Sequence, residues 1–407
     1  MRWMSLVGIA VILGVAVLLS TNRRAISFRI VVSAFALQIG IAALVLYVPA
    51  GRRAILAISH GVEAVIGYSQ AGITMVFGSL ANTNEGISFA VHVLPVVIFF
   101  AALMSILYHL GIMQWVVKLI GGALRWVIGT RTVESLCAAA TIFVGQTESP
   151  LAIRPYLRRL TEPQVFTVMV TGMASVAGTV LAAYAQLGIK LEYLLPASFM
   201  AMPGGLLMAK LIMPDDPADA RQIKEDVMLK DEGARHANVI MAAGAGAGDG
   251  VRLAVNIGAM LIAFVGLIAL FNGLVGWLGG LFGVEGLTLE KMLGVVFGPL
   301  MYLLSVPWAE AQISGAFFGE KLILNEFVAY LHFGQIAETL SPRAEAITTF
   351  ALCGFANLSS IAIQMGALGS LVPELREFIA RYGLRAVAAG SLSNLLSAAL
   401  AGLLLDV

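Results

Sequence analysis

Long apolar stretches alternate with short polar ones along the chain, and their lengths predict its architecture. Windows free of Asp, Glu, Lys and Arg cover residues 3–22, 30–51, 86–117, 163–189, 193–209, 253–284, 346–373 and 386–405. An α-helix needs about 20 apolar residues to cross the hydrocarbon core of a bilayer, and these windows are of that order or longer. The pattern therefore predicts eight transmembrane helices.

Three further regions do not read as simple crossings. Residues 51–80 carry scattered polar groups among apolar ones, which is typical of an amphipathic helix lying at the membrane interface. Residues 130–160 and 288–332 are apolar but are interrupted by polar residues and by Pro150 and Pro307, which break helices. Because irregular backbone at membrane depth is tolerated only inside protein or along a cavity, we predict two re-entrant hairpins that enter from opposite sides.

The two hairpins belong to two similar halves of the chain. Each is followed by a crossing with a polar break, at residues 172–179 and 354–360, and then by one more crossing. We therefore predict scaffold helices with an interfacial helix at 1–127, a first transport repeat at 128–213, a cytoplasmic loop with an interfacial helix and a long scaffold helix at 214–284, and a second transport repeat at 285–407. Inverted repeats with broken helices indicate a secondary transporter.

Composition and charge support an all-α polytopic membrane protein. Of the 407 residues 59% are hydrophobic and only 12% are charged, about half the share that is typical of soluble domains. The net charge of +1 leaves no electrostatic footprint for nucleic acid. Eighteen of the 25 Lys and Arg residues fall on one side of the predicted topology. The positive-inside rule then places both termini outside.

A few polar residues lie in segments predicted to be inside the membrane, where burying a polar group costs the most free energy. An ionised carboxylate at the bilayer centre costs about 2.5–3.5 kcal/mol on insertion scales, and such groups normally line a pathway. Glu148 and Glu326 each lie in a predicted hairpin, while Asn357 and Ser360 are three positions apart and share one helix face beside Phe355. Together with Gln146 and Thr147 they suit a neutral, hydroxyl-rich ligand that carries a planar ring.

An intramembrane enzyme acting on a polar neutral substrate is the alternative from another class. Such an enzyme needs a nucleophile with a base, or metal ligands. The five histidines form no H-E-x-x-H motif and no local pair with a serine motif. The pattern therefore favours a transporter over an enzyme.

Four ordered motifs resemble the concentrative nucleoside transporters, in particular their bacterial branch with eight transmembrane helices. They are GQTESP at 145–150, NEFVAY at 325–330, LSPRAE at 340–345 and GFANLSS at 354–360. The resemblance implies a homotrimer in the inner membrane, with both termini periplasmic, that imports nucleosides such as uridine, cytidine or adenosine. It implies substrate contacts from Gln146, Thr147, Glu148, Val180, Glu326, Phe355, Asn357 and Ser360.

The resemblance also implies a coupling ion and no other cofactor. The family's sodium ligands fall on Thr141, Val144, Ser175 and Val176, with the backbone acting at the two valines. Many sodium-coupled members carry Asn where this chain has Thr141, whereas some bacterial members that use protons carry a small hydroxyl residue there. Sodium is the favoured coupling ion, and a proton carried by Glu148 or Glu326 is the alternative.

Overall fold

The computed structural model describes residues 2–81, 88–216 and 236–405. Within these ranges the chain is helical and has no strand. The aqueous loop expected from residue 214 to residue 237 lies mostly outside the described residues. Among the described helices, eight are long and apolar enough to cross a membrane, and a ninth candidate is a pair of helices bent by 117°.

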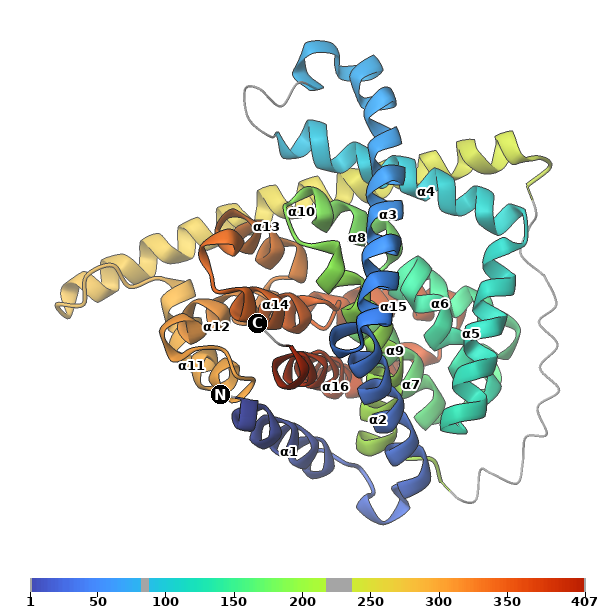
Figure 1. Ribbon diagram of the computed structural model, residues 1–407, viewed down its shortest axis with the longest axis horizontal. Coiled ribbons are helices and arrows are strands. Elements are labelled where there is room, and N and C mark those ends of the chain that lie inside the picture. The colour runs from blue at the N-terminus through green and yellow to red at the C-terminus, as the bar shows by residue number, and fades with distance from the viewer. Residues whose placement is uncertain (1, 82–87, 217–235, 406–407) are drawn as a thin grey trace.

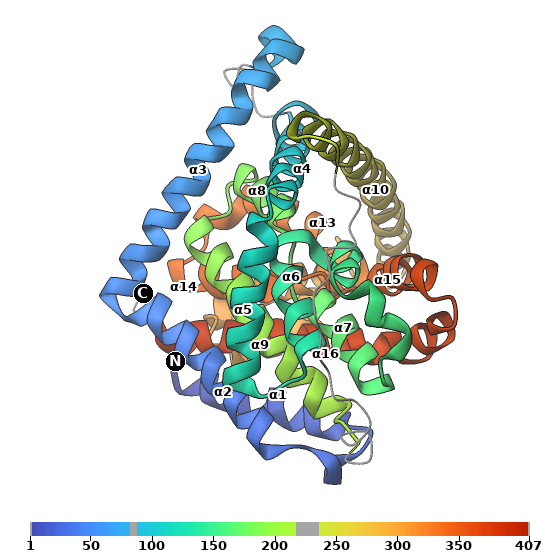
Figure 2. The same cartoon turned by 90° about the vertical axis from the view of Figure 1, so that its right-hand side faces the viewer.

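The outer part of the molecule consists of helices that bury little of their surface. It comprises α1 (Arg2–Leu18), α2 (Phe28–Ala42), α3 (Pro49–Phe77), α4 (Leu94–His109) and α10 (Val239–Leu281). Only 22% of the most apolar window is buried in α3, α4 and α10. Figure 1 shows α3 and α10 extending beyond the rest of the body, and Figure 2 shows α4 and α10 arching over one side of it.

The eight helices that are long and apolar enough to cross a membrane do not coincide one for one with the eight charge-free windows of the sequence. The first window forms only the 17 residues of α1, which is shorter than a usual span. The segment expected to be an interfacial helix forms α3, a continuous helix of 29 residues that also passes the length and composition test for a span. The window at 86–117 is divided by Gly111, whose φ of 78° ends α4 and starts α5 (Ile112–Ile128).

The glycine-rich segment at 244–250 is the beginning of α10 and is continuous with the long scaffold helix expected in this region. Asn238 caps this 43-residue helix by accepting a hydrogen bond from the Met241 amide at 2.8 Å. Gly246 and Gly250 lie directly against α4: a Cβ would come within 2.6 Å of the Ala101 carbonyl oxygen at Gly246, and within 2.7 Å of Ile98 Cα at Gly250. The glycines therefore allow close packing of the two helices.

The inner part of the molecule repeats one order of elements. The first half runs from α5 through a hairpin of α6 (Thr132–Glu148) and η6 (Ser149–Arg159) to a broken helix of α7 (Glu162–Ala174) and α8 (Gly178–Gln186), and ends with α9 (Leu191–Ile212). The second half runs from α11 (Leu289–Leu303) through α12 (Trp308–Ile323) and α13 (Glu326–Ile336) to α14 (Pro342–Leu352), α15 (Ser359–Leu371) and α16 (Leu375–Leu404).

This order of elements narrows the residue range of the second hairpin. The region expected as one hairpin at 288–332 contains three helices, because the chain also turns sharply between α11 and α12. In the order of elements α11 corresponds to α5, so the counterpart of the first hairpin is α12 with α13. The first hairpin turns at Gly145 (φ 76°, ψ −172°), and the second turns between Ile323 and Glu326.

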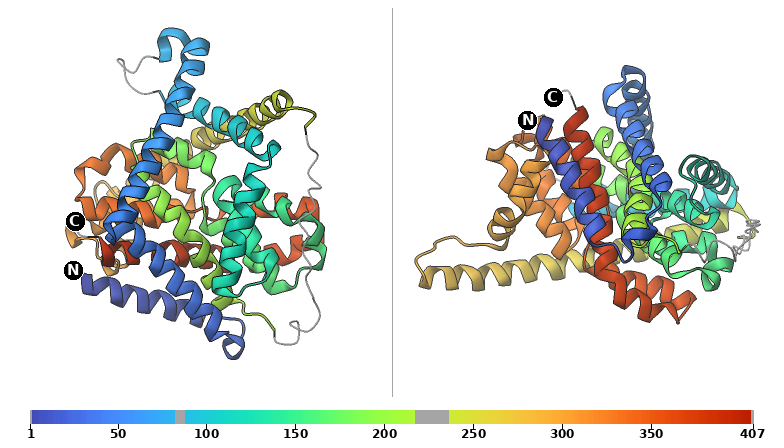
Figure 3. Two further views of the ribbon diagram at one scale, coloured as in Figure 1. Left: turned by 45° about the vertical axis from the view of Figure 1, so that its right-hand side comes forward. Right: turned by 90° about the horizontal axis from the view of Figure 1, so that it is seen from below.

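Helix α16 lies at the centre of the inner part and connects the two halves. It packs against α9, α14, α7 and α1. Figure 3 shows α1 and α16 side by side with the two ends of the chain together. An Arg2 guanidinium nitrogen donates to the Leu405 carbonyl at 3.4 Å. Both termini therefore lie on the same side of the protein.

One side chain of α16 donates hydrogen bonds to the free backbone carbonyls at both helix breaks. The Asn394 amide nitrogen donates to the carbonyls of Ala174 and Cys353, each at 2.7 Å. These carbonyls lie where α7 and α14 end, and the Phe355 amide donates to the Ser175 carbonyl at 3.2 Å. Because unpaired backbone groups are costly away from water, these bonds are what allow both helices to break inside the protein.

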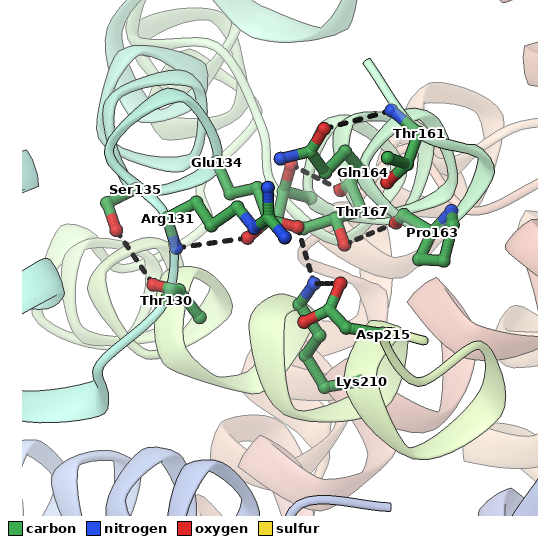
Figure 4. Close-up of polar contacts among 11 residues, drawn as sticks. Thr130, Arg131, Glu134, Ser135, Thr161, Pro163, Gln164, Thr167, Lys210 and Asp215 are labelled. Atoms are coloured by element: carbon green, nitrogen blue, oxygen red, sulfur yellow. Dashed lines mark hydrogen bonds and ion pairs between the residues drawn. The ribbon is translucent and has the colours of Figure 1, made fainter. Parts of the chain in front are cut away.

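A buried ion cluster holds the base of the first hairpin, as Figure 4 shows. The Lys210 ammonium on α9 donates to Glu134 at 2.5 Å and to Asp215 at 2.6 Å, and only 2% of the lysine side chain is exposed. The other oxygen of Glu134 accepts from the Arg131 amide at 3.2 Å. The cluster therefore ties the first turn of α6 to the end of α9.

A glycine at the second break provides a test of this packing. A Cβ on Gly354 would lie 2.3 Å from Asn394 Oδ1 and 2.7 Å from the Ala174 carbonyl oxygen. We expect Gly354→Ala to lower the stability by about 1–3 kcal/mol through overpacking, measured as a lower melting temperature in detergent. Gly366→Ala is the control, because it has open space in α15, and we expect it to raise the melting temperature slightly. Equal melting temperatures for the two variants would contradict the prediction.

Candidate functional site

A cavity of about 1580 Å³ lies between the two hairpin turns and the two helix breaks. All eight residues that the sequence singled out for substrate contacts line it: Gln146, Thr147, Glu148, Val180, Glu326, Phe355, Asn357 and Ser360. They come from α6, α8, α13, the segment that joins α14 to α15, and the first turn of α15. The fold thus brings together residues that are more than 200 positions apart in the chain.

Glu326 is held in place by neutral donors. It is the first residue of α13, and Asn325 caps that helix by accepting from the Val328 amide at 2.9 Å. One carboxylate oxygen accepts from the Tyr184 hydroxyl at 3.1 Å, and the other accepts from the Asn357 amide at 2.8 Å. Only 5% of the residue is exposed. Its carboxylate is therefore oriented by two side chains while it still lines the cavity.

Gln146 connects the first hairpin to the second broken helix. Its amide nitrogen donates to the Ser360 hydroxyl at 3.0 Å, and its amide oxygen accepts from Gln364 at 3.3 Å. Ser360 in turn donates to the Phe355 carbonyl, and the Ser360 amide donates to Asn357 Oδ1 at 2.9 Å. This network orients Gln146, Asn357 and Ser360 relative to one another on the cavity wall.

The remaining cavity residues differ in polarity. Thr147 and Glu148 are exposed to the cavity just beyond the turn of the first hairpin. Val180 and Phe355 supply apolar surface. The Phe355 ring lies close to the turn of the first hairpin, because a Cβ built on Gly145 would be 3.4 Å from it. The cavity therefore presents hydrogen-bonding groups together with an aromatic face, as a polar ligand with a planar ring requires.

The sequence motifs missed two residues of this network, Tyr184 and Gln364. Each lies four positions after a residue that was identified, Tyr184 after Val180 on α8 and Gln364 after Ser360 on α15. Side chains four positions apart share a helix face. Extending each motif by one helical turn would have found both.

The four residues expected to bind an ion lie on two neighbouring segments. Thr141 and Val144 belong to α6, while Ser175 and Val176 lie in the break after α7. The two segments are close, because a Cβ on Gly178 would lie 3.5 Å from the Phe143 carbonyl oxygen. Of the four residues, only Val144 also lines the cavity.

The chemistry of these residues suits a small monovalent cation. Thr141 and Ser175 are fully buried, and their hydroxyls donate to the Ala138 carbonyl at 2.7 Å and the Thr171 carbonyl at 3.0 Å, which leaves oxygen lone pairs for an ion. The negative end of the α7 dipole also points at this break. No group of three acidic, His or Cys side chains that could hold a metal is found in the described part of the chain. Neutral oxygens at a half-helix end are the usual ligands of sodium in transporters.

Family models match almost the whole chain. The model described as the C-terminus of Na+ dependent nucleoside transporters matches residues 193–402, the model of their N-terminus matches residues 7–80, and a nucleoside recognition (gate) model matches residues 90–190. The chain belongs to the concentrative nucleoside transporter family. It is a multi-pass membrane transporter and not an enzyme.

Several relatives and solved structures agree with this assignment. The chain is 47% identical to the nucleoside permease NupC of Helicobacter pylori, with 99% of this chain and 98% of the permease covered. It is 51% identical to an uncharacterized transporter of Haemophilus influenzae over 99% and 98% of the two chains. The mouse sodium/nucleoside cotransporter 1 is 37% identical over 98% of this chain and 63% of its own length.

Solved structures of the transporter CNTnw are among those that this chain resembles. A double variant in an outward-facing state superposes with a TM-score of 0.95 at 48% identity, covering 99% of this chain and 98% of that one. An inward-facing, substrate-bound structure of the same protein has a TM-score of 0.91 at 47% identity, with the same coverage. The transporter described here therefore shares a fold that has been observed facing both sides of the membrane.

The contact between Tyr184 and Glu326 provides a test of the site. We expect Tyr184→Phe to weaken nucleoside affinity about tenfold, because a hydrogen bond to a charged group contributes about 1.5 kcal/mol or more. Tyr330→Phe is the matched control, because the Tyr330 hydroxyl donates to the Thr349 carbonyl at 2.8 Å. Calorimetry with uridine measures both variants. If they bind equally well, Tyr184 does not position the carboxylate.

Proposed function

We propose that this chain is a sodium-coupled symporter that imports nucleosides such as uridine, cytidine or adenosine by alternating access. The observation that carries the proposal is the Glu326 carboxylate, held in the cavity by Tyr184 and Asn357. A buried carboxylate is an acceptor for the adjacent hydroxyls of a ribose. Asn357 and Ser360 provide further polar groups for the same sugar.

The nucleobase would bind on the side of the first hairpin. Gln146, Thr147 and Glu148 can match donors and acceptors on a base edge, while Val180 and Phe355 offer apolar surface to its ring. A neutral ligand of this kind agrees with the names of the matched families and with that of the Helicobacter pylori permease. The two halves of the binding site come from the two repeats, so relative movement of the repeats would open it alternately to each side.

Sodium is proposed as the coupling ion, bound by Thr141, Val144, Ser175 and Val176. The buried hydroxyls and the half-helix end support this proposal, as do the sodium-dependent families that the chain matches. Thr141 is shorter than the asparagine common at this position. A proton carried by Glu148 or Glu326 is therefore the alternative that the experiment has to separate.

We further propose a homotrimer in the inner membrane with both termini outside. The contact of Arg2 with Leu405 supports the part of this proposal that concerns the termini, because it requires both on one side. The weakly buried α3, α4 and α10 leave apolar faces for lipid or for neighbouring copies.

The role of the carboxylate is tested by Glu326→Gln. We expect uridine uptake into proteoliposomes to fall at least 30-fold, because hydrogen bonds to a charged acceptor contribute about 1.5–3 kcal/mol each. Glu290→Gln is the matched control, because Glu290 also accepts from an asparagine, Asn272 at 3.1 Å, but does not line the cavity. Uptake by Glu326→Gln at the rate of the control variant would refute the proposed ribose site.

The coupling ion is tested by varying sodium and pH gradients separately in the same proteoliposomes. Replacing external sodium by choline at fixed pH is expected to abolish concentrative uptake. Uptake that persists in choline and follows an imposed pH gradient would instead establish the proton alternative. Uptake that only equilibrates uridine under every gradient would show that the protein is not a symporter.

A further inference from the structure

Lys321 is a fully buried lysine near the end of α12, and its exposed fraction is 0%. Its ammonium donates to the Ala351 carbonyl at 2.8 Å and to Asn394 Oδ1 at 2.7 Å. Within the described ranges of the chain, no ion pair joins this lysine to a carboxylate. Among the described lysines Lys210 is also buried, and it has two carboxylate partners.

A buried ammonium without a carboxylate partner is expensive, so its surroundings must solvate it. Ala351 is the second-last residue of α14, so its carbonyl belongs to the negative end of that half-helix. Asn394 supplies a neutral amide oxygen. Backbone and amide oxygens at the end of a broken helix are the groups with which transporters bind a sodium ion.

The position of Lys321 corresponds to that of an ion ligand in the first repeat. Thr141 lies five residues before Gln146, and Lys321 lies five residues before Glu326. Gln146 and Glu326 each follow the turn of their hairpin and line the cavity. The first residue after α7 is Ser175, and the first residue after α14 is Cys353.

Asn394 joins the two locations. Its amide nitrogen donates to the carbonyls that end α7 and α14, while its amide oxygen accepts from Lys321. The lysine Nζ therefore lies at the second helix break, at the position that corresponds in the order of elements to the proposed ion site at the first break.

We propose that the Lys321 ammonium is a tethered cation that takes the place of a free coupling ion in the second repeat. This inference rests on the proposed ion site of the first repeat. A tethered cation stabilises the α14 break in every state and cannot dissociate. Only the first repeat then exchanges a cation with solution.

The test compares Lys321→Ser and Lys321→Gln with wild type and with the control Lys291→Ser, which removes an exposed lysine from α11 of the same repeat. Each purified protein is melted in sodium chloride and in choline chloride of equal concentration. Sodium dependence of uridine uptake is then measured in proteoliposomes. The serine removes the charge and opens space for an ion, whereas the glutamine keeps hydrogen-bond donors without the charge.

For Lys321→Ser we expect a lower melting temperature in choline than wild type and a larger rise on adding sodium, because a free ion now stabilises the folded state. The Hill coefficient for sodium should rise from about 1 to about 2, because two ions then bind together. A sodium response identical to that of wild type and Lys291→Ser would overturn the proposal.

For Lys321→Gln we expect at least a tenfold loss of uptake with a melting temperature close to that of wild type. Unchanged uptake would overturn the proposal, and this variant decides the matter if the serine variant does not fold. If wild type itself takes up no nucleoside, the proposed function fails, while the melting comparison still tests the tethered cation. If protons drive wild-type uptake, the extra sodium response of Lys321→Ser is still expected.

Discussion

The structure depends on one constraint, that every backbone polar group far from water needs a partner. Two helices break in the interior of this protein, and each break frees carbonyls that a continuous helix would have bonded. Asn394 satisfies both breaks from one position on α16, with bonds of 2.7 Å to Ala174 and Cys353. The central position of α16 and the narrow space beside Gly354 follow from this shared contact.

The breaks in turn create the site. A half-helix that ends inside the protein points its dipole and its free backbone groups at the space beyond it, and the two hairpin turns supply side chains to the same space. Gln146 and Ser360 meet there across the two repeats, as do Tyr184 and Glu326. The polar groups orient one another and remain on the cavity wall. This is how an interior with few charges can recognise a polar, uncharged solute.

The two repeats share an order of elements but differ in their chemistry. The first has hydroxyls at Thr141 and Ser175 beside its break, and the second has an ammonium at Lys321 and a thiol at Cys353. In the proposed function, the groups that would contact the base come chiefly from the first repeat and those that would contact the ribose from the second. The repeated order of elements thus provides a similar geometry twice, and the different residues at equivalent positions would divide substrate and ion binding as proposed.

The sequence by itself determined the class and predicted the repeats and the candidate site residues, because long charge-free windows and rare polar motifs are direct consequences of the bilayer. All eight substrate candidates line one cavity, and the chain belongs to the family that its motifs resemble. Only the tertiary structure decided that α3 and α10 are continuous helices and that Tyr184 and Lys321 meet their partners. A helix that is buried on all sides is largely apolar on every face. The periodicity of hydrophobic residues therefore does not show which distant residues it contacts. Packing between elements more than 70 residues apart sets those contacts.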